Sequence, residues 1–263
     1  MYASPQTGIT GFVVGFNEEH LLRQCLSHLQ GLNELLYIDL NSSDESVKVA
    51  ENLGASVICH DRVPVVEIIH AELLPICKCD WMLITDPDEV VDIFLKNQLI
   101  EIAANNPSDI GIVTAPWLFY FKKHPLKGTL WGGNNSRVIL INKNRVEFSA
   151  HVHRGRNLKP GFKLYNIEKE GDNIIHHYWM TSYAQLFEKH RRYIKREGES
   201  MYANGYRASF LGLLKAPLSG FKECFFTKKG YKDGLVGFNL SIFWAWYKTS
   251  AYLSLRSYER KQN

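Results

Sequence analysis

Hydrophobic and polar positions follow two different periods along the first half of the chain. Short β-branched apolar runs, such as 9–15 and 81–85, predict buried strands. Between them, apolar residues recur at spacings of three and four, which predicts amphipathic helices. The expected strands are 9–15, 35–40, 56–59, 81–85, 110–121 and 137–142, and the expected helices are 18–30, 43–53, 65–77, 93–104 and 183–199. This alternation predicts an α/β fold, with a mostly parallel sheet and helices on both of its faces.

The pattern changes near residue 204, where the charge of the chain also changes. Residues 205–263 include ten basic and three acidic residues, whereas the whole chain has a net charge of only +4. Within this segment, 234–247 has no charged residue and has five aromatic ones. We therefore expect two domains: an α/β domain at 1–204, and a basic, aromatic-rich helical appendage at 205–263.

The appendage is expected to dock on an anionic membrane surface without crossing it. Its uncharged stretch is too short to span a bilayer. Flanking lysines and the aromatic side chains suit the headgroup boundary. The alternative is a helical hairpin that caps the core and carries solvated lysines. A basic tail can also bind nucleic acid, but no stacking-plus-basic motif of a known module occurs, so no nucleic-acid partner is expected.

The cysteines and the start of the chain favour a cytoplasmic location. The five cysteines are odd in number and form no Cys-x-x-Cys pair, which is typical of reduced thiols in the cytosol. No basic segment precedes the apolar run 9–16, which predicts a strand rather than a secretory leader. The sequence therefore predicts a cytoplasmic protein bound peripherally to the inner face of the cell membrane.

Three carboxylates follow the predicted strand 81–85 directly, namely Asp86, Asp88 and Glu89. Like charges this close repel one another, and a cation relieves the repulsion. Two aspartates separated by one residue can point at a single divalent ion, and carboxylate oxygens suit Mg²⁺ or Mn²⁺, which in turn bind diphosphates. The alternative is a solvated acidic turn that caps the following helix.

Polar residues also follow the first and second predicted strands. Phe16, Asn17 and Glu18 end the first, and helix capping alone can explain the last two. Asp39 lies at the end of the second strand, where capping gives it no role. Because ligands of parallel sheets bind at the carboxyl ends of strands, these positions are expected to line one site.

The three strand-end segments together resemble the family 2 glycosyltransferases. Phe-Asn-Glu-Glu at 16–19, Asp-x-x-Ser-x-Asp at 39–44 and the Asp-x-Asp segment at 80–89 match that family's motifs in order and spacing. The resemblance is strong over 8–104 and looser over 105–180. It is closest to the bacterial subgroup that acts on lipopolysaccharide core and related surface glycans, and it implies a GT-A (Rossmann-like) fold.

The resemblance implies a nucleotide-sugar donor, with a UDP-sugar expected, and a lipid-linked or lipopolysaccharide-type glycan acceptor. Phe16, Asn17 and Glu18 are then expected to line the nucleotide pocket, and Asp39 is expected to contact the base or the ribose. The family also implies inversion at the transferred carbon.

The resemblance further implies that Asp86 and Asp88 hold Mn²⁺ or Mg²⁺ on the donor diphosphate, where Asp86 also contacts the donor. The segment His176-His177-Tyr178 is similar to the family as well, and His177 is the candidate for a further metal ligand. Ser136-Arg137 resembles a family strand that carries an arginine. For the histidines, a hydrogen-bonded structural imidazole is the alternative.

The catalytic base is expected among Glu147, His151 and His153. The segment 148–153 resembles a Val-His-Glu motif of the family, but Arg154 stands where the family has glutamate. This departure keeps a second hypothesis open, in which the chain is a non-catalytic nucleotide-sugar-binding scaffold of the same fold. Intact Asp86 and Asp88 favour the enzyme.

Overall fold

The computed structural model describes residues 8–63, 66–73, 76–133, 135–148 and 156–262. The chain forms two compact units, one made by Met1–Trp117 with Asn135–His177 and the other by Leu118–Asn134 with Tyr178–Asn263. Each unit is therefore built from two separate stretches of chain. The second unit includes 118–134 and 178–204, which lie before the boundary that the charge pattern suggests.

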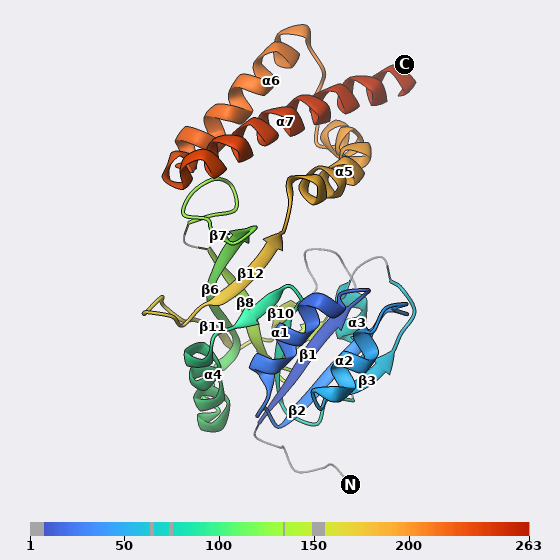
Figure 1. The fold of residues 1–263 in the computed structure, drawn as a ribbon. Helices are drawn as coiled ribbons and strands as arrows, with labels where there is room; N and C mark the ends of the chain where they lie inside the picture. Colours follow the sequence, from blue (N-terminus) through green and yellow to red (C-terminus); the bar gives the residue numbers. More distant parts are fainter. Residues whose placement is uncertain (1–7, 64–65, 74–75, 134, 149–155, 263) are drawn as a thin grey trace. The chain divides into compact units, whose positions relative to one another are not determined.

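The strands form a ten-stranded sheet and a separate pair (Figure 1). In the large sheet the order is β3-β2-β1-β4-β8-β6-β12-β5, and both β7 and β11 pair with β6. The strands are β1 (Ile9–Gly15), β2 (Glu34–Asp39), β3 (Ser56–Cys59), β4 (Trp81–Thr85), β5 (Glu89–Val91), β6 (Ile110–Phe121), β7 (His124–Pro125), β8 (Asn135–Asn142), β9 (Val146–Phe148), β10 (Arg156–Leu158), β11 (Lys163–Asn166) and β12 (Ile175–Met180).

The parallel part of the sheet fixes where the motif residues lie. β1 pairs in parallel with β2 on one side and with β4 on the other, and β2 pairs in parallel with β3. All residues of β1 and β4 are buried, which explains their nearly continuous apolar sequences. The carboxyl ends of these strands therefore share one edge of the sheet.

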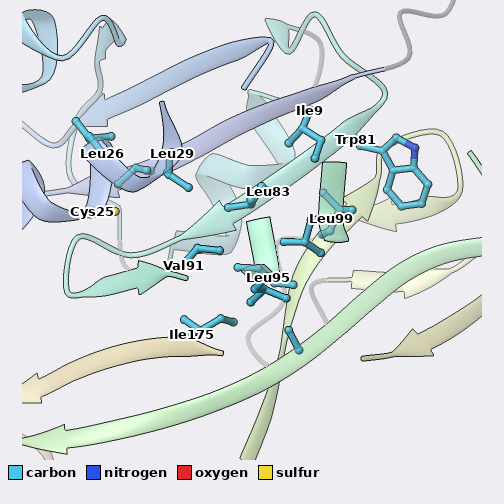
Figure 2. Packing of buried hydrophobic residues seen from close by; sticks show 14 of the residues in the cluster. Ile9, Cys25, Leu26, Leu29, Trp81, Leu83, Val91, Leu95, Leu99 and Ile175 are labelled. Carbon is cyan, nitrogen blue, oxygen red and sulfur yellow. The ribbon is translucent and has the colours of Figure 1, made fainter. Parts of the chain in front are cut away.

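Helices cover both faces of this sheet, as predicted. The helices of the first unit are α1 (Glu19–Leu29), α2 (Ser46–Asn52), α3 (Val66–Glu72) and α4 (Ile93–Asn105). On one face, α1, α2 and α4 pack against β1 and β4 in the cluster that Figure 2 shows, where Leu26, Leu83 and Leu99 are fully buried. On the other face, Ile69 of α3 packs with Phe12. The predicted α/β fold is confirmed.

Beyond β4 the sheet is mixed, and here the sequence pattern is less informative. β8 is antiparallel to β4 and to β6, and β12 is antiparallel to β5. The predicted strands 110–121 and 137–142 are confirmed as β6 and β8. Several short strands between 89 and 180 were not predicted, because two to six residues are too few to display a period. The predicted helix 65–77 is shorter and ends at Glu72.

The second unit is mainly helical. Its helices are α5 (Tyr183–Ala203), α6 (Phe210–Lys222), the π-helical turn η2 (Glu223–Thr227), the 3₁₀ turn η3 (Gly230–Asp233) and α7 (Gly234–Gln262). α7 packs against both α5 and α6. A Cβ at Gly198 of α5 would lie 2.4 Å from the Ser254 carbonyl carbon of α7, so glycine permits this close crossing. No helix among the described residues has the length and apolar character needed to span a membrane.

A buried carboxylate joins the two stretches of the second unit. Asp233 is almost fully buried, and its two oxygens accept hydrogen bonds from the backbone N–H groups of Lys127 (2.7 Å) and Gly128 (2.8 Å). Glycine is required beside this contact, because a Cβ on Gly128 would lie 2.1 Å from the Lys229 carbonyl oxygen. The Gly-Tyr-Lys-Asp-Gly turn at 230–234 thus has a structural role.

Candidate functional site

Reciprocal hydrogen bonds join the loops that follow β1 and β2. Asn17 adopts a left-handed conformation (φ 54°), which asparagine tolerates better than most residues. Its backbone N–H donates to Ser42 Oγ (3.0 Å), and its side-chain oxygen accepts from the Ser43 N–H (2.7 Å). The Glu19 carboxylate likewise accepts from the Glu45 N–H (2.8 Å). Many of the polar groups in the first two motifs therefore form hydrogen bonds that hold the two loops together.

Asp39 lies at the carboxyl end of β2 but is only 2% exposed. One carboxylate oxygen accepts from the Ser42 N–H (2.9 Å), and the other accepts from the Tyr37 hydroxyl (3.4 Å). Burial, together with the nearby Asp39 charge, raises the pKa of Tyr37 to about 12, so this hydroxyl stays a donor at neutral pH. Asp39 thereby fixes the turn from which the second motif projects.

Phe16, at the end of β1, meets a cation that follows β3. The Arg62 guanidinium carbon lies 3.6 Å from the centroid of the Phe16 ring. Next to Arg62 in sequence, Asp61 accepts a hydrogen bond from the Asn41 side chain (3.2 Å). A planar guanidinium after β3 and an aromatic ring after β1, on either side of β2 in the sheet, offer flat surfaces on which a nucleobase can stack.

The turn after β4 lies against the end of β1. A Cβ on Gly15 would lie 2.9 Å from both Pro87 Cγ and the Tyr37 hydroxyl, so glycine permits the approach of this turn. Cys25 of α1 also contacts it, with Sγ 3.5 Å from the Asp86 carbonyl oxygen. Burial and the surrounding carboxylates raise the pKa of Cys25 well above its usual value, which keeps it a neutral thiol. The turn after β4 therefore lies beside the end of β1, which the first motif follows.

Arg137 of β8 neutralises part of the acidic turn. Its guanidinium forms an ion pair with Glu89, which is 0% exposed, and lies 3.4 Å from an Asp86 oxygen. Glu89 also accepts hydrogen bonds from the Thr85 hydroxyl (2.9 Å) and the Asp86 N–H (3.1 Å). Burial raises the pKa of Glu89, and the Arg137 charge opposes that rise. Glu89 is thus an internal partner of Arg137, whereas the Asp86 side chain is 52% exposed.

The Asp88 side chain contacts His177, the last residue of the first unit. Its Oδ2 lies 3.1 Å from His177 Nε2, although the two residues are 89 positions apart. The His177 ring stacks on Trp117 of β6, with centroids 4.8 Å apart and planes inclined by 7°. The Arg137 guanidinium also lies near the Trp117 ring, 5.4 Å from its centroid. Trp117 therefore supports both the imidazole and the arginine.

The candidate metal ligands meet in part. Asp88 and His177 are in contact, while Asp86 lies near Arg137. Among the residues that the structure describes, no group of three or more His, Cys, Asp and Glu side chains is arranged to hold a metal ion. A cation that arrives with a nucleotide needs only one or two protein carboxylates, because phosphate oxygens and water supply the other ligands. The half-buried Asp88 and the exposed Asp86 fit that requirement.

One of the three candidate bases lies within the described residues. Glu147, on β9, is exposed, and β9 pairs with β10 antiparallel. His151 and His153 lie outside the described residues, as does Arg154. Near this segment, Arg156 of β10 contacts His70 Nδ1 (3.0 Å). Burial and the Arg156 charge lower the pKa of His70 to about 3, so this imidazole is neutral.

Sequence reasoning missed two side chains at this edge of the sheet, Arg62 and Trp117. Arg62 follows a predicted strand just as the motif residues do, so its position was a usable signal. Trp117 lies inside a long apolar run, where nothing distinguishes it from core residues.

The sequence is similar to curated glycosyltransferases along nearly its whole length. No family model matches it. It is 24% identical to an uncharacterized glycosyltransferase of Rickettsia typhi, over 96% of this chain and 88% of that protein. It is 22% identical to the lipopolysaccharide core biosynthesis glycosyltransferase LpsC of Rhizobium meliloti, over 89% of this chain and 86% of LpsC.

Solved structures with some likeness include glucosyl-3-phosphoglycerate synthase from Mycobacterium tuberculosis, in complex with Mn²⁺ and UDP-glucose. The identity is 18% and the TM-score is 0.36, and the match covers 41% of this chain and 43% of the synthase. The assignment of activity therefore depends on the sequence relatives. Their similarity extends over both units of the chain, and the protein is a glycosyltransferase.

Proposed function

We propose that the enzyme transfers a sugar from a nucleotide-sugar, with UDP as the expected nucleotide, to a lipid-linked or lipopolysaccharide-type glycan. The contact between Asp88 and His177, at the edge where β1, β2 and β4 end, carries this proposal. An acidic turn that only caps a helix in solvent has no need of a histidine partner, whereas Asp88 has one in His177. The motif resemblance to family 2 supports the donor class, and the similarity to LpsC, a lipopolysaccharide core biosynthesis glycosyltransferase, supports the acceptor class.

In this proposal the donor lies across the ends of the parallel strands. Phe16 and Arg62 stack the base, Asn17 and Glu18 line the nucleotide through their loop, and Asp39 holds the turn beside it. Asp88 and Asp86 would hold Mn²⁺ or Mg²⁺ on the diphosphate, and His177, which contacts Asp88, would be a further ligand. When bound, the metal offsets the charge that develops on the leaving nucleoside diphosphate. Arg137 keeps part of the acidic turn neutral beforehand.

Donor binding tests the proposal directly. UDP-sugars with Mn²⁺ should raise the melting temperature, because a ligand that binds only the folded state stabilises it by about 2.7 kcal/mol at 100 times its Kd. The shift should disappear in EDTA. Asp39→Asn should reduce the shift caused by free UDP as much as that caused by the sugar donor, because the turn beside the base is disturbed. The donor assignment is wrong if no nucleotide-sugar shifts the melting temperature.

The acceptor hydroxyl needs a base, and we propose that Glu147, His151 or His153 supplies it. A positioned base contributes roughly 10²–10⁴ in rate. One of the three single alanine variants should therefore lose activity on that scale, and its pH–rate profile should lose the acid limb of the wild type. Near wild-type rates in all three variants would move the base elsewhere.

We further propose that the second unit docks the enzyme on an anionic cytoplasmic leaflet. Leu211, Leu214 and Leu218 of α6 lie on one helix face and are all exposed. Leu235, Phe238 and Ile242 repeat the same spacing on α7 and are also exposed, with lysines in the turns between the two helices. Apolar burial and the attraction of lysines to anionic lipid, about 1 kcal/mol for each lysine near the surface, favour binding.

Vesicle co-sedimentation tests the docking. The full chain should bind anionic vesicles at low salt, leave them partly at high salt, and leave them fully in detergent. Leu218→Asp should lower the bound fraction roughly tenfold, since it removes about 1.5–3 kcal/mol of apolar burial. Phe94→Asp, at another exposed apolar position, on α4 of the first unit, is the matched control and should bind normally. A wild type that stays in the supernatant at low salt would make α6 and α7 a structural cap.

A further inference from the structure

A cavity of 510 Å³ lies within the second unit, between α5, α6 and α7. Close helix crossings bound it, because α7 meets α6 at Gly220, where a Cβ would lie 3.1 Å from Ala245 Cα, and meets α5 at Gly198. Apart from Trp244, which comes just before the first crossing, the α7 residues that line the cavity fall between Ala245 and Ser254. The volume is within the range of pockets that hold small organic ligands, about 300–1,000 Å³.

The wall of the cavity is mainly apolar, and its charges are unequal. Small and apolar side chains such as Met201, Ala216 and Ala251 line it, with Trp244 among the aromatic ones. The other lining residues include two lysines and one glutamate. The lining also includes polar side chains such as Ser200, Asn204 and Ser219, and its apolar side chains offer a surface on which a hydrocarbon chain can pack.

Two of the three charged side chains are already engaged. Glu197 accepts a hydrogen bond from the Tyr247 hydroxyl (3.3 Å). Lys248 forms an ion pair with Glu223 (3.3 Å). Lys215 has neither an ion pair nor a hydrogen bond within the described part of the chain, and it is exposed at the cavity. The cavity therefore offers one ammonium group that is available to an anion.

Lys215 also lies beside the exposed apolar row of α6. Leu211 precedes it by four residues and Leu218 follows it by three, so both are its neighbours on the helix surface. One side of this position is a mainly apolar cavity and the other is an exposed apolar face. A ligand that joins an anionic head to an apolar chain matches both.

We propose that the cavity between α5, α6 and α7 binds one phosphate-bearing lipid, with the phosphate at Lys215 and the hydrocarbon chain along Ala216, Met201 and Ala251. The proposed membrane docking explains where the lipid comes from, and the inference rests on it in this respect alone. It differs from docking in that a single lipid is held in a defined cavity, and binding does not need a membrane.

The test uses the full-length protein and soluble probes without donor or metal. Decyl phosphate, below its micellar concentration, should change the tryptophan fluorescence through Trp244 and bind saturably. Inorganic phosphate and the neutral decyl maltoside are the two comparison ligands, and each should bind at least tenfold more weakly. If inorganic phosphate binds as tightly as decyl phosphate, the site is for a small anion and the proposal fails.

Lys215→Gln should weaken decyl phosphate binding about tenfold, since a charge-assisted contact is lost. Lys222→Gln is the matched control, because Lys222 is an exposed lysine of the same helix outside the cavity. Ala216→Leu should also weaken binding by filling the cavity. Equal affinities for Lys215→Gln and Lys222→Gln would overturn the proposal. Because donor-dependent stabilisation is measured separately, failure here leaves the glycosyltransferase proposal intact, and the reverse holds as well.

Discussion

Replacing Asp88 by asparagine is expected to slow sugar transfer by roughly 10³-fold, the scale on which single electrostatic groups act in a transition state. Asparagine keeps the shape of the side chain and a contact to His177, but it lacks the charge that holds a divalent cation. Stability should not fall, because the change relieves repulsion within the acidic turn. Steady-state rates with saturating Mn²⁺, together with thermal melts, measure both effects.

Asp172→Asn is the matched control for this substitution, since Asp172 is an exposed aspartate of the same unit whose side chain forms no hydrogen bond or ion pair with the described residues. It should retain the wild-type rate. Wild-type transfer that continues undiminished in excess EDTA would contradict the metal role of Asp88, whatever the variant does.

Arg137→Met is expected to lower the free energy of unfolding by about 3–5 kcal/mol, the usual effect of removing one partner of a buried ion pair. Methionine retains much of the apolar length of arginine, so the loss reflects mainly the charge left on Glu89, which is fully buried. Urea denaturation at pH 7 measures it. Adding Glu89→Gln should recover part of the loss, because glutamine needs no counter-charge.

The loss in Arg137→Met should depend on pH in a definite direction. Burial already raises the pKa of Glu89, and removal of the arginine leaves that rise unopposed. A carboxyl whose pKa is higher in the folded state than in the unfolded state destabilises progressively as pH rises from the unfolded value to the folded value. The variant should therefore be nearer to the wild type at pH 5 than at pH 8. A deficit that is the same at both pH values would show that lost packing, rather than charge, is responsible.

The sequence was informative wherever a buried strand ended in polar residues. Residues 9–15 and 81–85 are buried throughout and nearly all apolar because helices cover both faces of their sheet, so the end of each strand is visible in the sequence. The proximity of the first and third motifs followed from parallel pairing. Strand ends are a local property and parallel pairing is a topological one, and the hydrophobic pattern of a sequence can predict both.

The partners of the motif residues could not be predicted in the same way. Asp88 meets His177 because a three-residue strand, β5, pairs with β12, and so short a strand has no readable period. The engagement of Asn17 with the loop after β2 likewise depends on a hydrogen bond between residues 26 positions apart. Such contacts come from tertiary packing, and residue types alone do not specify which distant residues will meet.

The Asp233 contact has a consequence for how the protein is made. The N–H groups that its carboxylate binds belong to residues 106 and 105 positions earlier in the chain. At translation rates of about 5–20 residues per second, the segment 118–134 leaves the ribosome roughly 5–20 s before its partner is synthesised. Its two backbone donors must therefore be hydrated, or covered by another molecule, during that interval. The first unit needs only residues up to 177, so it can assemble before α6 and α7 of the second unit are synthesised.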